Sequence, residues 1–169
     1  MKKLILAAAC AAIIPLAQAQ GPNDAQIAGI VVAANTVDIN AGKLAEQTSS
    51  NKDVQAFARM MVNDHTSVNQ NATALVKKLK VTPQDSDTAR SLKAGGESNI
   101  SKLKGLTGKD FDKAYVDNEV TYHQAVIDAL DKTLIPNARN AELKQTLVNV
   151  RPSFVAHLEH AKHLQSALK

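Results

Sequence analysis

Four stretches of this sequence carry apolar side chains at the three-and-four spacing of an amphipathic helix, and this pattern limits the possible folds most strongly. A helix with one apolar stripe has to bury that stripe against other elements. Four such helices, each about 25 residues or longer, predict an all-α four-helix bundle. We expect the long helices at about 23–49, 51–80, 108–134 and 140–168.

Residues with capping side chains precede each predicted helix. Their side-chain oxygens can accept hydrogen bonds from the free amides of a first helical turn. A fifth, shorter helix is expected over about 83–104, as a connection between the second and third long helices. Gly95-Gly96 predicts a break of this connection into two short pieces. The predicted caps are Asn23, Ser50, Thr82, Thr107 and Asn140.

One ionisable side chain interrupts the apolar stripe of each long helix. These residues are Asp38, His65, His123 and His157. Burying a charge costs several kcal/mol unless it is paired or bound to a metal ion. Because each helix contributes one such residue, we expect the four to meet inside the bundle as a polar centre.

An aspartate with three histidines is a common set of ligands for a transition metal. Zinc or copper suits this set better than iron, and Glu119, one turn before His123, is a fifth candidate ligand or a hydrogen-bond partner. Asp64, beside His65, is a further candidate partner for a neighbouring histidine. Counted along their helices, Asp38, His65 and His123 lie at similar heights, whereas His157 is expected about one turn deeper.

Two interpretations of this centre remain open. In one, the protein binds a single transition metal ion and buffers or senses it. In the other, Asp38 pairs with His65 in a structural network, and the protein is a non-catalytic envelope interaction or stress protein. The sequence has no Glu-x-x-His pair, phosphate-binding glycine loop or nucleophile elbow, so no catalytic residue is predicted and enzymatic activity stays undecided.

The first 19 residues have the three parts of a secretory signal peptide. A basic start at Lys2 and Lys3 precedes an apolar run over 4–16 and a small-x-small ending at Ala19. The apolar run is shorter than the roughly 20 residues that a membrane-spanning helix needs, which favours cleavage over a retained anchor. We therefore predict a periplasmic mature chain, residues 20–169, which folds as one domain without cysteine because Cys10 is removed.

The balance of charge and aromatic residues makes nucleic acid an improbable partner. The chain has 20 basic and 16 acidic residues, and two of the lysines lie in the predicted signal peptide. Only three Phe, two Tyr and no Trp are present, so no basic surface is interleaved with aromatic side chains. The predicted mature chain also contains no membrane span.

Three segments resemble motifs of a bacterial exported family labelled domain of unknown function 4142. They are 57–65 (FARMMVNDH), 111–115 (FDKAY) and 154–158 (FVAHL). The resemblance covers nearly the whole mature chain and implies a periplasmic, ferritin-like helical bundle without an established activity. It places Asp64, His65, His123 and His157 among the family's motif positions, and Asp38 stands where the family pattern often has Glu.

Overall fold

This computed structural model describes residues 21–168, and every regular element in that range is a helix. The four long helices are α1 (Asp24–Thr48), α2 (Lys52–Lys78), α4 (Gly108–Ala129) and α6 (Ala141–Ala167), and α3 (Asp87–Lys104) connects α2 to α4. A π-helical turn, η1 (Leu130–Leu134), and the short α5 (Ile135–Asn137) extend α4. The all-α prediction, with four long helices and a helical connection, is confirmed. The signal-peptide prediction for residues 1–19 lies outside the described residues.

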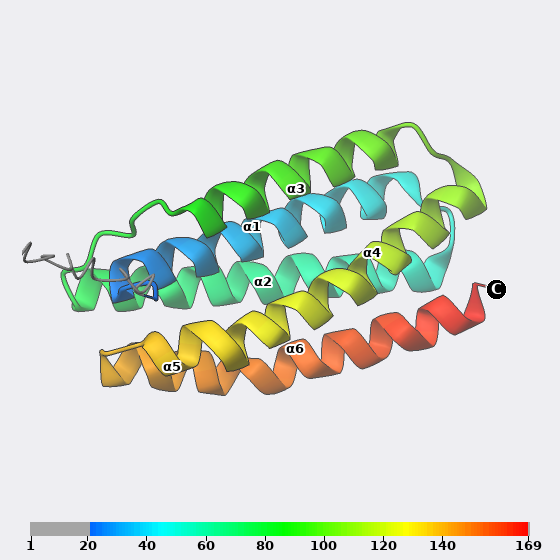
Figure 1. The fold of residues 1–169 in the computed structure, drawn as a ribbon. Coiled ribbons are helices and arrows are strands. Elements are labelled where there is room, and N and C mark those ends of the chain that lie inside the picture. Colours follow the sequence, from blue (N-terminus) through cyan, green and yellow to red (C-terminus); the bar gives the residue numbers. More distant parts are fainter. Residues whose placement is uncertain (1–20, 169) are drawn as a thin grey trace, which may run out of the picture.

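The bundle consists of two antiparallel helix pairs, α1 with α2 and α4 with α6 (Figure 1). The pairs meet through contacts of α1 with α4 and of α2 with α6. α3 runs along the outer side of α1 and extends the bundle laterally (Figure 1). Within residues 21–168, none of the helices combines the length and apolarity needed to cross a membrane.

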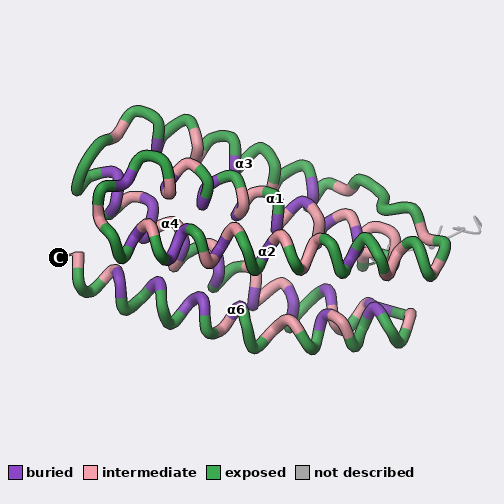
Figure 2. Tube along the Cα trace, turned by 180° about the vertical axis from the view of Figure 1, so that it is seen from behind, coloured by how far each residue is buried: buried purple, intermediate pink, exposed green. Residues whose placement is uncertain are grey.

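Two apolar clusters fill the interior, one toward each end of the bundle. Buried positions recur along the helices at the spacing expected for amphipathic helices (Figure 2). The first cluster includes Ile27, Ile30, Leu130, Leu147 and Phe154. The second includes Phe57, Met61, Phe111, Tyr115 and Leu164. On α1, α2 and α4 the interrupting polar residues fall between the segments that supply these clusters, so a polar layer separates two apolar cores.

The caps explain where several helices begin. The Asn23 side chain accepts from the amide of Gln26 at 2.9 Å, and the Gln26 side chain accepts from the amide of Asn23 at 3.0 Å. Asn140 caps α6 as predicted, with its side chain accepting from two amides of the first turn. For α2 and α3 the caps are Asn51 and Ser86, one and four residues after the predicted ones.

The predicted break of α3 at Gly95-Gly96 is wrong, because the helix is continuous from Asp87 to Lys104. Gly96 is buried against α1, and a Cβ at this position would lie 2.7 Å from Cγ2 of Val37. The missing side chain lets the two helices approach closely. That packing offsets the cost of glycine in a helix, about 1 kcal/mol relative to alanine.

The helical run after α4 ends later than predicted, at Asn137 instead of residue 134. Pro136 has no amide to donate to the carbonyl of Lys132, and its ring would clash with that carbonyl in a regular α-helix. The π turn ends at Leu134, two positions before this proline. As a result, the chain continues one more turn along the bundle before it reverses into α6.

Candidate metal centre

All five predicted site residues lie in the polar layer between the two apolar clusters. Asp38 comes from α1, His65 from α2, Glu119 and His123 from α4, and His157 from α6. Each is buried, with at most 3 % of its surface exposed. The prediction that residues of four helices would meet in the interior therefore holds in the structure.

Asp38 contacts two of the three histidines. Its Oδ2 atom lies 3.0 Å from Nε2 of His65 and 3.4 Å from Nε2 of His123. Glu119 joins from the same turn of α4: single ligand atoms of Asp38, Glu119 and His123 all lie within 4.8 Å of one another. Helices α1, α2 and α4 therefore bring two carboxyl groups and two imidazoles close together.

The three histidine rings form a second, overlapping group. Ring centroids are 5.6 Å apart for His65 and His123, 5.3 Å for His65 and His157, and 5.4 Å for His123 and His157. One ring nitrogen from each lies within 4.8 Å of the others. We expected His157 to lie about a turn too deep, and that expectation is wrong. The helical run ends at Asn137, so His123 is fourteen residues before this end and His157 sixteen residues after the start of α6.

Each histidine donates a hydrogen bond from the nitrogen that points away from the centre. Nδ1 of His65 lies 2.6 Å from Oδ1 of Asn35, whose amide nitrogen donates to the carbonyl of Val31 at 2.9 Å. Nδ1 of His123 lies 3.0 Å from the backbone oxygen of Glu119. These acceptors fix the proton on Nδ1 of both rings, so that in the neutral form each Nε2 carries a lone pair.

His157 has the opposite tautomer. Its Nε2 lies 2.9 Å from Oδ2 of Asp64, a half-exposed carboxylate on α2. This contact leaves Nδ1 as the atom with the free lone pair. Asp64 thus takes the supporting role suggested by its place beside His65, although it supports the histidine of another helix.

Each of the five residues keeps at least one buried polar atom without a hydrogen-bond partner. These atoms are both oxygens of Asp38, Nε2 of His65, Nε2 of His123, Nδ1 of His157 and Oε2 of Glu119. Buried polar groups are nearly always satisfied in folded proteins, so a cluster of unpartnered acceptors requires a proton or a cation among them. The donor set, imidazole nitrogen with carboxylate oxygen, fits a transition metal ion.

Burial keeps histidines of the centre in the form that binds metals. It lowers the pKa of His123 to about 4. Burial also lowers the pKa of His157, against the opposing effect of the hydrogen bond and charge of Asp64. Both rings are therefore neutral near pH 7, and a neutral ring is the one that ligates.

The two carboxyl groups differ in charge. Burial raises the pKa of Asp38, but the neighbouring His65, His123 and His157 outweigh it, and the net pKa is lowered. Burial and the charge of Asp38 raise the pKa of Glu119 well above its usual value. Without an ion, the centre thus carries one carboxylate, Asp38, beside a neutral Glu119.

Sequence reasoning missed Asn35 and Phe154 as parts of this centre. Asn35 is buried one turn before Asp38 on α1, and Phe154 stacks on His65 with ring centroids 5.2 Å apart and planes at 6°. A polar residue three positions before Asp38 was the available signal for Asn35. For Phe154 the sequence showed only a position in the apolar stripe of α6, with no sign of a contact with His65.

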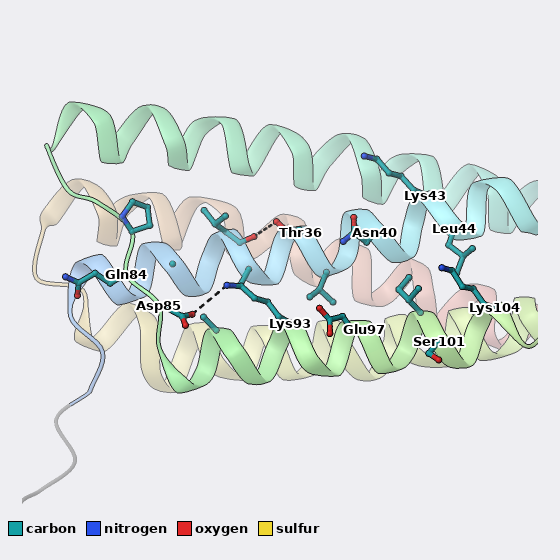
Figure 3. A pocket seen from close by; sticks show the side chains of 18 of the residues that line it. Thr36, Asn40, Lys43, Leu44, Gln84, Asp85, Lys93, Glu97, Ser101 and Lys104 are labelled. Carbon is teal, nitrogen blue, oxygen red and sulfur yellow. Dashed lines mark hydrogen bonds and ion pairs between the residues drawn. The ribbon is translucent and has the colours of Figure 1, made fainter.

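A separate hollow of about 930 Å³ lies along α1 and α3, away from the centre (Figure 3). Its lining is polar and charged at several positions, and two of the lining residues, Lys93 of α3 and Asp85 just before it, form an ion pair with Nζ 3.7 Å from Oδ1. None of the five residues of the centre lines this hollow. The hollow and the centre are therefore lined by different residues.

Residues 12–164 match the sequence model of a family described as Domain of unknown function (DUF4142). The match spans most of the chain, so the chain belongs to this family. No curated protein and no solved structure matches it. Family membership agrees with the resemblance seen in the sequence, and any function has to come from the centre itself.

Proposed function

We propose that this protein binds one transition metal ion at the buried centre and acts in the periplasm as a buffer or sensor for it. Asp38, His65 and His123 are the principal ligands, and His157 or Glu119 completes the shell. Zinc and copper suit this set better than iron. The sequence of residues 1–19, which predicts a signal peptide cleaved after Ala19, supports the periplasmic location.

The observation that carries the proposal is the set of unpartnered acceptor atoms that face one another. Ligand atoms about 2.0–2.1 Å from a tetrahedral ion are about 3.3 Å apart. The two Asp38 contacts, 3.0 Å to His65 and 3.4 Å to His123, are close to this spacing. The outward hydrogen bonds of all three histidines are the supporting contacts that metal-ligating imidazoles usually make.

A second candidate function follows from the same contact between Asp38 and His65. A proton on Nε2 of His65 would turn the 3.0 Å contact into an ion pair and satisfy Asp38 without a metal. The centre would then only stabilise and orient the four helices. In that case the protein is a non-catalytic envelope interaction or stress protein.

A titration of the chain from Gln20 onward, produced without a His tag, separates the two candidates. We expect about one equivalent of Zn²⁺ or Cu²⁺ to bind, and binding to be lost in the His65→Ala, His123→Ala double variant. A His65→Gln variant, which keeps a side chain of similar size, tests the same ligand if the double variant does not fold. His163→Ala, at an exposed histidine of α6, is the control for binding at the surface. Unchanged affinity in folded His65 variants would contradict the metal proposal.

A further inference from the structure

An apolar cavity of about 240 Å³ ends at the proposed metal centre. Asp38, His65 and His123 form its polar floor, whereas His157 and Glu119 do not line it. Most of the remaining lining is aliphatic or aromatic and comes from all the helices around the bundle core. The apolar lining includes Ile30, Val31, Val68, Leu92, Val126, Leu134, Val150 and Phe154.

The size and lining of the cavity define what it can hold. At about 30 Å³ for each water-sized group, its volume corresponds to about eight such groups. Water needs two to four polar partners to be stable in a buried site, and these walls offer few. A hydrocarbon chain of about six carbons fits both the volume and the walls.

The polar floor of the cavity determines which polar group a bound hydrocarbon chain can carry at that end. Without an ion it presents the Asp38 carboxylate and the unpartnered nitrogens of His65 and His123, whose lone pairs can bind a proton or a cation. No lysine or arginine is among the residues that line the cavity in the described part of the chain. An anionic head would therefore be repelled by the empty centre and attracted once a divalent ion neutralises it.

We propose that the cavity binds a straight-chain carboxylate of about six carbons, with the chain against the apolar walls and the carboxylate on the bound ion. This inference rests on the proposed function, because the ion supplies the contact for the head. Asp38, His65 and His123 hold the ion from the protein side. The carboxylate takes the remaining coordination position, which His157 or Glu119 fills when the cavity is empty, as an exchangeable ligand does in open zinc sites. The protein then responds to the metal and to a small amphiphile together.

The test is calorimetric titration of hexanoate into zinc-loaded and metal-free protein, with zinc binding measured first in a separate titration. Acetate is the comparison that has the head without the chain. We expect hexanoate to bind zinc-loaded protein about tenfold or more tightly than acetate does, because acetate buries no chain. We also expect at least about tenfold weaker binding of hexanoate to metal-free protein.

Filling the cavity should abolish the effect of the chain. Ala129→Leu and Val150→Phe add bulk from α4 and from α6, so that one variant remains if the other does not fold. In either variant we expect hexanoate to bind no better than acetate, with zinc affinity within about threefold of wild type. Ala114→Leu, at a half-buried alanine of α4 outside this cavity, is the matched control and should bind hexanoate as wild type does.

The outcomes separate this inference from the proposed function. Zinc binding without a preference for hexanoate, or a preference that survives both filling variants, would overturn the inference and leave the metal centre intact. If neither zinc nor copper binds, the proposed function fails. In that case, hexanoate binding to the wild-type protein that is lost in Ala129→Leu would still support the cavity as the site of the chain. No hexanoate binding to the wild-type protein would overturn the cavity site as well.

Discussion

Nε2 of His65 lies 3.0 Å from Oδ2 of Asp38, yet neither atom has a hydrogen-bond partner. The opposite ring nitrogen of His65 donates to Asn35, so the ring is held in place from behind. Two buried atoms that each have a lone pair are stable at this distance only with a cation or a proton between or beside them. We therefore expect metal affinity to be sensitive to single substitutions of this pair and of the residues that hold it.

Replacing Asp38 by Asn should weaken zinc binding by more than about 100-fold. The substitution keeps the size of the side chain but removes the one carboxylate that is charged at the centre of the metal-free protein. Substitution of a ligand is expected to cost more than the 10- to 100-fold that is typical of a supporting residue. Competition with a chelating dye measures the affinity. Asp110→Asn, at an exposed aspartate of α4, should leave it unchanged; a full-affinity Asp38→Asn protein would remove Asp38 from the ligand set.

Asn35→Ala should weaken zinc binding by about 10- to 100-fold while one equivalent still binds. Asn35 accepts from Nδ1 of His65 at 2.6 Å and so selects the tautomer whose Nε2 faces Asp38. Without it, the ring loses its fixed orientation but stays a ligand. The same competition assay gives both the affinity and the stoichiometry. Asn40→Ala, an exposed asparagine on the same helix, is the control, and equal affinities for the two variants would show that the contact of Asn35 with His65 is not used.

The arrangement of the four long helices and the meeting of Asp38, His65, His123 and His157 could be predicted from the sequence. Both follow from periodicity, since residues on one face of a helix share a neighbour across the bundle. The depth of His157 could not be predicted, because it depends on where the chain reverses. The π turn and Pro136 moved that point by a few residues, and helix ends are the least certain part of a pattern.

The contacts that decide the chemistry were less accessible from sequence. Glycine lowers helix propensity, so Gly95-Gly96 predicted a break, but the packing of Gly96 on Val37 is a tertiary contact that local preferences do not contain. In the same way, Asn35 is one of several polar residues on α1, and only its distance to His65 distinguishes it. The apolar cavity above Asp38 depends on gaps between side chains of five helices, which no single stripe encodes.

The contribution of His123 to the stability of the metal-free protein should be lost as the pH falls from about 6.5 toward 4. Its folded pKa is about 4, below the unfolded value of 6.5, so the unfolded chain binds the extra proton first. Over this window the loss from His123 is about 3 kcal/mol, and His157 acts in the same direction. Urea unfolding at pH 7, 6, 5 and 4 measures this loss. The contribution of the neighbouring Asp38 to stability is lost only at lower pH, because the pKa of Asp38 is lowered in the folded protein.

Glu119 acts in the opposite direction, so the histidine effect is best measured in a Glu119→Gln background. There the free energy of unfolding should fall steadily between pH 7 and 5. His123→Gln added to this background should flatten most of the slope. A slope that is the same with and without His123 would mean that another group causes it.

Glu119→Gln should stabilise the metal-free protein relative to wild type at pH 8 and have little effect at pH 4. The folded protein keeps this carboxyl group neutral because burial and Asp38 raise its pKa well above its usual value. Unfolded Glu ionises above about 4.5, so its contribution to stability is lost as the pH rises, whereas Gln does not ionise. Thermal unfolding at both pH values measures the difference. Glu97→Gln, on the exposed face of α3, should show no such dependence, and a Glu119→Gln protein that is less stable than wild type at pH 8 would indicate an ionised, paired Glu119.

Adjacent glycines of α3 should respond in opposite ways to alanine. A Cβ at Gly96 would lie 2.7 Å from Cγ2 of Val37, so Gly96→Ala forces α3 away from α1 and should destabilise the protein by about 1–3 kcal/mol. At Gly95 a Cβ meets nothing within 4 Å, so Gly95→Ala should stabilise it by about 0.5–1 kcal/mol through helix propensity alone. Urea unfolding of both variants gives the signs. Val37→Ala removes the two methyl groups that the new Cβ would meet, and it should recover part of the loss in the Gly96→Ala protein but add nothing to Gly95→Ala. Equal effects of alanine at both positions would show that the close approach of α3 to α1 does not depend on Gly96.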